Sequence, residues 1–526
     1  MSNASEKPLS DSYSYDVLPS FAGSPIDNET NGATHIDDDS SRFTRINESY
    51  GADNGFVMVG PILKYLSKTV HTLKLRFTDH AGHAILNKLE KKNTFSTEWL
   101  DGLRGIACVF VVFHHTDITF EFFMPPREGE NLFFSYLRWF AGVSPICLWN
   151  AGPAMVAIFF IVSGFSISLG SLRHCHTRQQ QKILTSLSSS VFRRWMRLYL
   201  PTLVVMFGDM LASYSGLYNG MGPMGRHRQP PKFDTLSLQL KDWSAHVWQL
   251  SDPLQSFQLL PPGVGYTPLY DPNIWTIPVE FRGSMIVFTT ILALSCVRFR
   301  LLMLCAIFGF LLHNNHLLMA PFLGGTLLAE IHFCRQSWEA DIKTMLQTEL
   351  VPHQQPAEDL RQRCKSQMMN CARFLATTKG GDYLLNIFWI LNFAVALYNL
   401  GSAQKKADLY GTLTSAMHVT LAISNSECLQ AIFTTKKVRF LGKISFMLYL
   451  VHGVVIHTVG WYFWFSIAAP WFGNTTEWQH LVSTGLASLL ILVIAASIAY
   501  GLSLTLDVWS NSFARVLLRK VTIRIN

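Results

Sequence analysis

One arginine and one histidine stand eleven residues apart in the apolar stretch LDGLRGIACVFVVFHH, which has the composition of a membrane helix. Eleven residues of α-helix turn through roughly 1100°, about 20° past three full turns, so Arg104 and His115 share one face. Ionisable side chains are costly in hydrocarbon and usually mark a functional site. The spacing therefore predicts one functional groove, with a cation near its mouth and a deeper imidazole suited to acid–base chemistry.

Three arginines precede another apolar run, in VFRRWMRLYLP. Arg193, Arg194 and Arg197 include pairs spaced three and four apart, and such pairs share a helix face and can clamp a phosphate group in bidentate fashion. Anchoring of the helix by the positive-inside rule explains the same residues equally well. The residues alone leave both interpretations open.

Glu280 and Arg282 lie near the start of the fourth apolar run, in WTIPVEFRGS. Residues two apart do not face each other on a helix, so we expect each to need another partner. Glu280 lies roughly 10 Å and His115 roughly 8 Å from the outer ends of their runs, so the two side chains can meet. His452, in LGKISFMLYLVHGVVIH, is typical of a helix-to-helix hydrogen bond and ranks below His115 as a catalytic candidate.

The composition indicates a membrane protein. Of 526 residues, 49% are hydrophobic and only 15% are charged, which is too apolar for an ordinary soluble protein. A net charge of +8 could indicate nucleic-acid binding, but the basic residues stand in short clusters between apolar runs and indicate topology instead. We therefore expect an all-α polytopic helix bundle in the lipid bilayer, without a nucleic-acid partner.

Ten apolar runs approach the roughly 20 residues that a membrane helix needs. They centre on residues 100–121, 149–170, 198–216, 273–294, 299–313, 316–333, 383–401, 410–433, 440–464 and 480–505. The fifth run is short, so the fifth and sixth can alternatively form one re-entrant pair. Of the 43 Lys and Arg residues, 34 fall on one side of this arrangement, which predicts that both termini are cytosolic.

The segments flanking these runs are assigned by composition. Residues 1–55 are rich in Ser, Asp and Asn, which predicts a disordered cytosolic tail without a cleavable signal peptide. Residues 56–97 mix apolar and basic residues, as in a cytosolic or membrane-surface amphipathic segment, although a soluble helix packed on the domain fits as well. Residues 98–510 are expected to form the membrane domain, and residues 511–526 a cytosolic basic tail.

The sequence gives few signals for metal binding or covalent modification. The nine cysteines include no CxxC pair and no zinc-like spacing with histidine, so neither a disulfide framework nor a metal site is predicted. The sequons at Asn3, Asn28 and Asn47 fall in the expected cytosolic tail. Asn474, in NTT on the expected outer side, is the predicted glycosylation site.

Five motifs, taken in order, resemble those of the acyltransferase 3 family of integral-membrane O-acyltransferases. They are LDGLRG followed by His115, FFIVSGF, RRxxR before LYLP, WTIPVE and LGKISFMLYLVH. The segment WTIPVEFRGS is similar to the sequences of the fungal branch of this family. The resemblance covers about residues 98–505. It implies transfer of an acyl group, commonly acetyl from acetyl-CoA, to a hydroxyl of a sugar, lipid or small metabolite.

The resemblance implies catalytic roles for three residues. The family's essential arginine and histidine fall on Arg104 and His115, and the glutamate of its Trp/Glu motif falls on Glu280. His115 would be the general base for the acceptor hydroxyl, Glu280 would orient or stabilise the imidazole, and Arg104 would guide the pantetheine arm or a phosphate. A covalent variant, in which His115 itself is acylated, fits the same residues.

The resemblance also implies a binding pocket. Arg193 and Arg197, with Arg194 beside them, would hold the nucleotide end of acyl-CoA at the cytosolic mouth. Further pocket residues would be Asp101, Ser163, Gly164, Trp275 and His452. The small residues of FFIVSGF are, taken alone, typical of close helix packing. The chain departs from many relatives at Phe281, where a second acidic residue is common, and at Val451, where an aromatic residue is common.

Acyl-CoA is the implied co-substrate, and no bound cofactor is expected. The implied acceptor is a hydroxylated small molecule such as a secondary metabolite, with a cell-wall glycan or a lipid as the alternative. A transporter is the rival class, but the sequence lacks the matching broken helices in two halves that transporters usually have. A catalytically silent scaffold has no need of Arg104 and His115 on one face. The oligomeric state and the choice between an endomembrane and the plasma membrane stay open.

Overall fold

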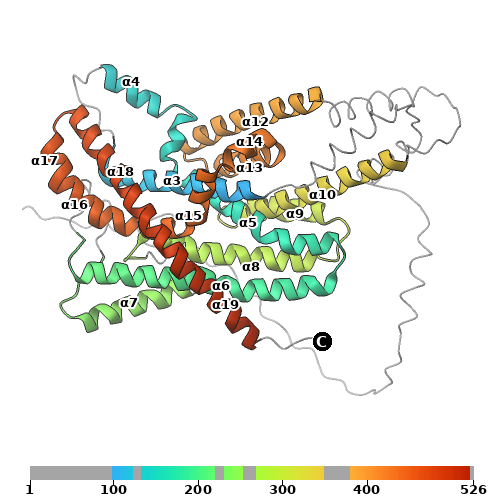
Figure 1. Cartoon of the computed structure of the whole chain (residues 1–526), viewed down its shortest axis with the longest axis horizontal. Helices are drawn as coiled ribbons and strands as arrows, with labels where there is room; N and C mark the ends of the chain where they lie inside the picture. The colour runs from blue at the N-terminus through green and yellow to red at the C-terminus, as the bar shows by residue number, and fades with distance from the viewer. Residues whose placement is uncertain (1–96, 123–131, 219–229, 253–267, 349–378, 522–526) are drawn as a thin grey trace, which may run out of the picture. The chain divides into compact units, whose positions relative to one another are not determined.

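The computed structural model describes residues 97–122, 132–218, 230–252, 268–348 and 379–521. Every regular element in these ranges is helical, and no strand occurs among them, so the predicted all-α class is confirmed (Figure 1). The predictions for the N-terminal tail and for nearly all of the amphipathic segment that follows it lie outside the described residues.

Six helical segments are long and apolar enough to cross a membrane. They are α3 (Glu98–Phe120), α5 (Gly152–His176), η2 (Pro272–Trp275) joined to α8 (Thr276–Leu294), most of α12 (Lys379–Lys405), and the two rods Lys436–Phe472 and Glu477–Lys520. Such helices satisfy their backbone hydrogen bonds internally, as crossing a bilayer requires. The predicted multi-pass bundle is therefore confirmed for these six segments, whereas the full set of ten spans and the cytosolic termini stay predictions.

Shorter or more polar helices cover the other expected runs. They are α6 (Gln180–Tyr214), α9 (Arg300–His313), α10 (Ala320–Thr348), α13 (Leu409–Asn425) and α14 (Glu427–Phe433). The connection between α3 and α5 contains α4 (Leu132–Ala141) and η1 (Ile146–Asn150). α6 joins the arginine motif and the third apolar run in one helix of 35 residues, roughly 52 Å long. The motif is therefore carried by a rigid element that continues into the apolar part of the bundle.

Two long rods end the chain. The first runs from α15 (Lys436–Val455) through the π-helical η3 (Ile456–Gly460), α16 (Trp461–Phe463) and the π-helical η4 (Trp464–Ala468) to α17 (Ala469–Phe472). The second runs from α18 (Glu477–Leu502) through the π-helical η5 (Ser503–Asp507) to α19 (Val508–Val521). Residues 511–521, expected within a basic tail, are thus helical and continuous with an apolar rod. π-helical turns occur frequently at functional sites, and η3 lies close to His452 in the sequence.

Two glycines permit close contacts that hold the helices of the site together. A Cβ atom at Gly442 of α15 would lie 2.2 Å from the carbonyl oxygen of Asp101 in α3. A Cβ atom at Gly164 of α5 would lie 2.0 Å from the carbonyl oxygen of Phe322 in α10. Any larger residue at either position would force the backbones apart. The glycines therefore set the packing of the helices that carry Arg104 and Ser163.

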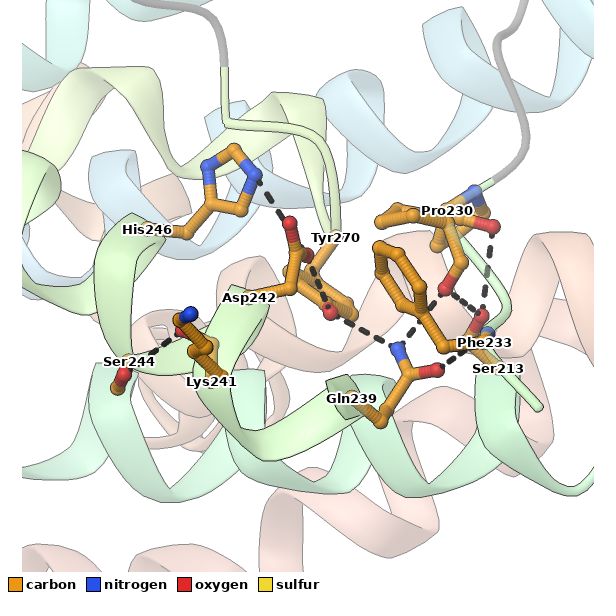
Figure 2. Close-up of polar contacts among 10 residues, drawn as sticks. Ser213, Pro230, Phe233, Gln239, Lys241, Asp242, Ser244, His246 and Tyr270 are labelled. Carbon is orange, nitrogen blue, oxygen red and sulfur yellow. Dashed lines mark hydrogen bonds and ion pairs between the residues drawn. The ribbon is translucent and has the colours of Figure 1, made fainter. Parts of the chain in front are cut away.

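A polar network ties α7 (Leu236–Ser251) to the segment before η2 (Figure 2). Gln239 Nε2 donates hydrogen bonds to the carbonyl of Pro231 and the hydroxyl of Tyr270, each at 2.8 Å. Tyr270 in turn donates to Asp242 Oδ2 at 2.8 Å. Burial raises the pKa of the Tyr270 phenol, so this group stays protonated and remains a donor. The network thereby fixes the entry of the chain into η2 and α8.

Candidate active site

A cavity of about 630 Å³ lies between α3, α5, α6, α8, α15 and α19. Its wall includes the arginines 104, 193, 194, 197 and 515 and the serines 163, 166, 186 and 190. Glu280 is the only carboxylate among the described residues that line it. An excess of guanidinium groups around one cavity favours an anionic ligand.

The buried end of the cavity is built around Arg194 of α6. Its Nη2 lies 2.6 Å from Glu280 Oε1 and 2.9 Å from Ser163 Oγ, and its Nε donates to Ser284 Oγ at 2.8 Å. Ser163 Oγ donates to the same carboxylate oxygen at 2.6 Å. Glu280 thus has a partner other than Arg282, as the helix spacing predicts. An ion pair whose charges offset each other thus joins α6 to α8, and the hydrogen bonds of Ser163 attach α5 to it.

Arg104 also lines the cavity, from one wall formed by α3. Its Nη1 lies 3.3 Å from Asp101 Oδ1, and 24% of its side chain is exposed against 55% for Asp101. The more exposed partner is the better hydrated one, so this ion pair contributes little free energy. Arg104 is close enough to Arg197 for the two like charges to repel each other. Binding of an anion in the cavity would relieve that repulsion.

Arg193 and Arg197 are exposed and lie on α6 toward the mouth of the cavity. Arg193 Nε donates to the carbonyl of Ser189, one turn earlier in α6, at 3.1 Å. Within the described part of the chain, neither residue forms an ion pair with a carboxylate. Their guanidinium groups therefore remain available for an anion that enters the cavity.

The two candidate histidines lie beside each other outside the cavity wall. The ring centroids of His115 and His452 are 5.1 Å apart. His452 is fully buried, and its Nδ1 donates to the carbonyl of Tyr449 at 2.6 Å, because a carbonyl oxygen only accepts. Its Nε2 has no hydrogen-bond partner among the described residues. In the neutral ring this nitrogen is the unprotonated one.

Tyr449 connects the histidine pair with the cavity. It lines the cavity, and its ring centroid lies 5.5 Å from that of His452. Its hydroxyl donates to the carbonyl of Asn273 at 2.7 Å and accepts a hydrogen bond from Thr276 at 2.9 Å. The contacts therefore run from the cavity wall through Tyr449 and His452 to His115, which is half-buried and is not among the described lining residues.

The remaining predicted site residues lie around this arrangement. Gly164 faces α10 and is not among the described residues of the cavity wall, in keeping with its role in packing. Trp275 is half-buried in η2 and packs against the main apolar core. Asn474 is exposed in the turn before α18, and its glycosylation stays a prediction.

Two residues of the cavity wall, Tyr449 and Arg515, are not among the residues predicted from the sequence. Tyr449 is an aromatic residue three positions before His452, and that spacing on a helix was the signal for it. Arg515, with Asn511 one turn earlier, lines the cavity from α19. A basic residue near a terminus is easily assigned to a solvated tail, so nothing in its local sequence indicated a cavity wall.

One cluster has the composition of a metal site. Single ligand atoms of His176, Glu330 and Cys334 lie within 4.8 Å of one another, although the sequence predicts no metal site. Glu330 Oε2 lies 3.2 Å from His176 Nε2, and Glu330 Oε1 lies 3.0 Å from Arg300 Nε. The carboxylate already has a permanent cation as its partner, and a metal ion would have to bind beside it. The contacts indicate an ion-pair junction of α5, α9 and α10.

Comparison with known proteins gives relatives over most of the chain. The sequence model of an acyltransferase domain matches residues 97–502. The chain is 28% identical over 445 residues to O-acetyltransferase PaAT-1 of Phomopsis amygdali, which covers 78% of this chain and 83% of that protein. It is 24% identical to acyltransferase R4 of a Phoma species and 26% identical to acyltransferase clz18 of Cochliobolus lunatus, in each case over 45% of this chain and 58% of the relative. No solved structure matches the chain.

Proposed function

The chain belongs to the acyltransferase 3 family, and we propose that it transfers an acetyl group from acetyl-CoA to a hydroxyl of a small molecule. The family establishes a multi-pass membrane acyltransferase. The choice of acetyl is supported by similarity to a fungal protein that is named an O-acetyltransferase. As acceptor we propose a hydroxylated secondary metabolite rather than a glycan or a lipid. Comparison of the metabolites of a deletion strain with those of its parent tests that choice.

The observation that carries the proposal is the arginine-lined cavity. Coenzyme A has a diphosphate and a 3′-phosphate at one end and an uncharged pantetheine arm at the other. Arg193 and Arg197, which are exposed and without carboxylate partners in the described ranges, suit the phosphates. Glu280 offsets the charge of Arg194 at the buried end, which suits the uncharged arm. The donor would therefore enter with its thioester leading.

In the proposed reaction, His115 is the general base. It takes the proton of the acceptor hydroxyl while the hydroxyl oxygen attacks the carbonyl carbon of the thioester. The tetrahedral intermediate then collapses with cleavage of the C–S bond, and the leaving thiolate receives the proton from the imidazolium. Because the ring contacts run from Tyr449 in the cavity wall through His452 to His115, we propose that the thioester reaches His115 by passing Tyr449.

The contacts of Glu280 favour a positioning role. Its carboxylate accepts hydrogen bonds from Arg194 and Ser163. These contacts support a role in holding Arg194 in the cavity wall rather than in orienting His115. The buried ring of His452, which contacts that of His115, is the better placed group for supporting the imidazole. We therefore assign Glu280 to the donor side of the site and His452 to the histidine side.

Replacement of His115 tests the base. His115→Ala should lower kcat by about 10² to 10⁴-fold, the usual contribution of a general base, while folded protein is retained. His418→Ala is the matched control, because His418 is also a half-buried histidine but bonds to Asn392 on a neighbouring helix. The measurement is acceptor-dependent release of CoA by purified protein in nanodiscs. Turnover of His115→Ala at the wild-type rate would refute the assignment.

Direct transfer and an acylated His115 are separated by label retention. Wild-type protein is mixed with radiolabelled acetyl-CoA without acceptor and quenched rapidly. Direct transfer predicts that the denatured protein retains no label. Label that is retained by wild type and lost in His115→Ala would establish the covalent route instead.

A further inference from the structure

The C-terminal helix α19 forms part of the cavity wall. Asn511, Ala514 and Arg515 line the cavity, and their spacing of three and four residues places them on one helix face. Ala514 is 2% exposed, because α19 packs there against α6 (Figure 1). The helix that carries the arginine motif and the helix that ends the chain therefore meet at the cavity.

Arg515 has no charged partner within the described ranges. Its side chain is exposed, and its Nη2 donates to Ser512 Oγ, on its own helix, at 3.2 Å. A guanidinium group has five N–H donors, so most of those of Arg515 are free for a ligand. The position of Arg515 on the cavity wall, together with these free donors, makes it a second cationic contact for an anion, on a different helix from Arg193 and Arg197.

The charges along the cavity differ between its two ends. At the buried end, Arg194 is offset by Glu280 at 2.6 Å. On the exposed part of the wall, Arg193, Arg197 and Arg515 have no carboxylate among the described lining residues. Arg193 and Arg197 are one turn apart on α6, roughly 5–6 Å between Cβ atoms, which suits one compact diphosphate. A cation on another helix suits a phosphate group that branches from the ligand elsewhere.

We infer that Arg515 binds the 3′-phosphate of coenzyme A, while Arg193 and Arg197 bind the diphosphate. This inference rests on the proposed function. The 3′-phosphate is a monoester that carries a second negative charge at neutral pH, and it pairs well with the planar fork of an arginine. If the inference is correct, Arg515 makes the protein bind CoA more tightly than dephospho-CoA, which lacks only the 3′-phosphate.

The test compares two nucleotides against two arginine variants. Binding of CoA and of dephospho-CoA is measured by calorimetry on full-length protein in nanodiscs. Arg515→Ala should weaken CoA binding about 10-fold or more, as expected for a lost charge-assisted hydrogen bond, and leave dephospho-CoA binding unchanged. Arg519→Ala is the matched control, since Arg519 is an exposed arginine one turn further along α19 that is not among the lining residues.

The outcomes separate this inference from the proposed function. Loss of discrimination between the two nucleotides in Arg515→Ala alone, with partial recovery in Arg515→Lys, supports the assignment. An equal loss of affinity for both nucleotides, or tight CoA binding by Arg515→Ala, overturns it and leaves the acyltransferase proposal standing. If wild-type protein binds neither nucleotide, the acetyl-CoA proposal and this inference are both overturned.

Discussion

The arginine-lined cavity and the histidine pair occupy neighbouring parts of one helix bundle, yet they are packed in opposite ways. The cavity wall leaves Arg193 and Arg197 exposed around a volume of about 630 Å³. His452 is fully buried, and Tyr449 beside it is fixed by hydrogen bonds to Thr276 and Asn273. The difference indicates that the cavity proposed to bind the donor is open in advance, whereas the part proposed to perform the chemistry would admit the thioester by a movement of packed side chains.

The largest expected effect is at the ion pair that closes the buried end of the cavity. Arg194→Ala would leave Glu280 as a largely buried carboxylate without its cation, and breaking such a pair typically costs about 3–5 kcal/mol. We expect a large fall in the thermal unfolding temperature. Arg194→Ala combined with Glu280→Gln should recover much of that loss, because the uncompensated charge is then absent. A single variant as stable as wild type would show that the ion pair does not stabilise the buried end of the cavity.

The second prediction concerns the open part alone. Arg197→Ala should raise the KM for acetyl-CoA about 10-fold or more while the KM for the acceptor changes little, because a charge-assisted contact with phosphate is lost. Arg178→Ala, at an exposed arginine that is not among the described lining residues, is the control. An effect confined to the acceptor would contradict the role of Arg197 in donor binding.

The third prediction concerns the packed part. Tyr449→Phe removes a hydroxyl that accepts a hydrogen bond from Thr276 and donates one to the carbonyl of Asn273. Leaving a buried donor or acceptor without its partner costs about 1–3 kcal/mol. We expect kcat to fall and the KM for acetyl-CoA to stay within about twofold, since the phosphate contacts are intact. Tyr462→Phe, at an exposed tyrosine in the same rod, serves as the control. A raised KM for acetyl-CoA with unchanged kcat would show that Tyr449 acts in donor binding, and would contradict the separation of donor binding from chemistry.

The smallest expected effect lies outside both parts, in α7. Burial lowers the pKa of His246, partly opposed by Asp242 at 3.8 Å. The unfolded chain therefore binds a proton more readily than the folded one, and the stability contributed by neutral His246 is lost as the pH falls below about 6.5. We expect His246→Gln to reduce the drop in unfolding temperature between pH 7.5 and pH 5.5. An identical drop in both proteins would contradict this.

The sequence predicts the parts of the site that depend on spacing along one helix. The arginine motif on α6 and the spacing that keeps Glu280 and Arg282 from facing each other follow from helical geometry, whereas the shared groove of Arg104 and His115 stays a prediction, because only Arg104 is among the described lining residues. The pairing of Glu280 with Arg194 could not be predicted, because it depends on how α6 and α8 cross. The contribution of Arg515 depends likewise on the packing of α19 against α6. For the same reason, sequence alone could not show that His115 stands behind Tyr449 and not in the cavity wall.

We propose that the arginines of the cavity bind the donor and that His115 acts only in the chemical step. Equilibrium binding of acetyl-CoA to the protein in nanodiscs tests this proposal most directly. Three proteins are compared, namely wild type, His115→Ala, and Arg193→Ala combined with Arg197→Ala. We predict that His115→Ala binds acetyl-CoA as tightly as wild type, whereas the double arginine variant binds about 100-fold more weakly. Equal affinity of the double variant and wild type, or loss of binding in His115→Ala, would contradict the account.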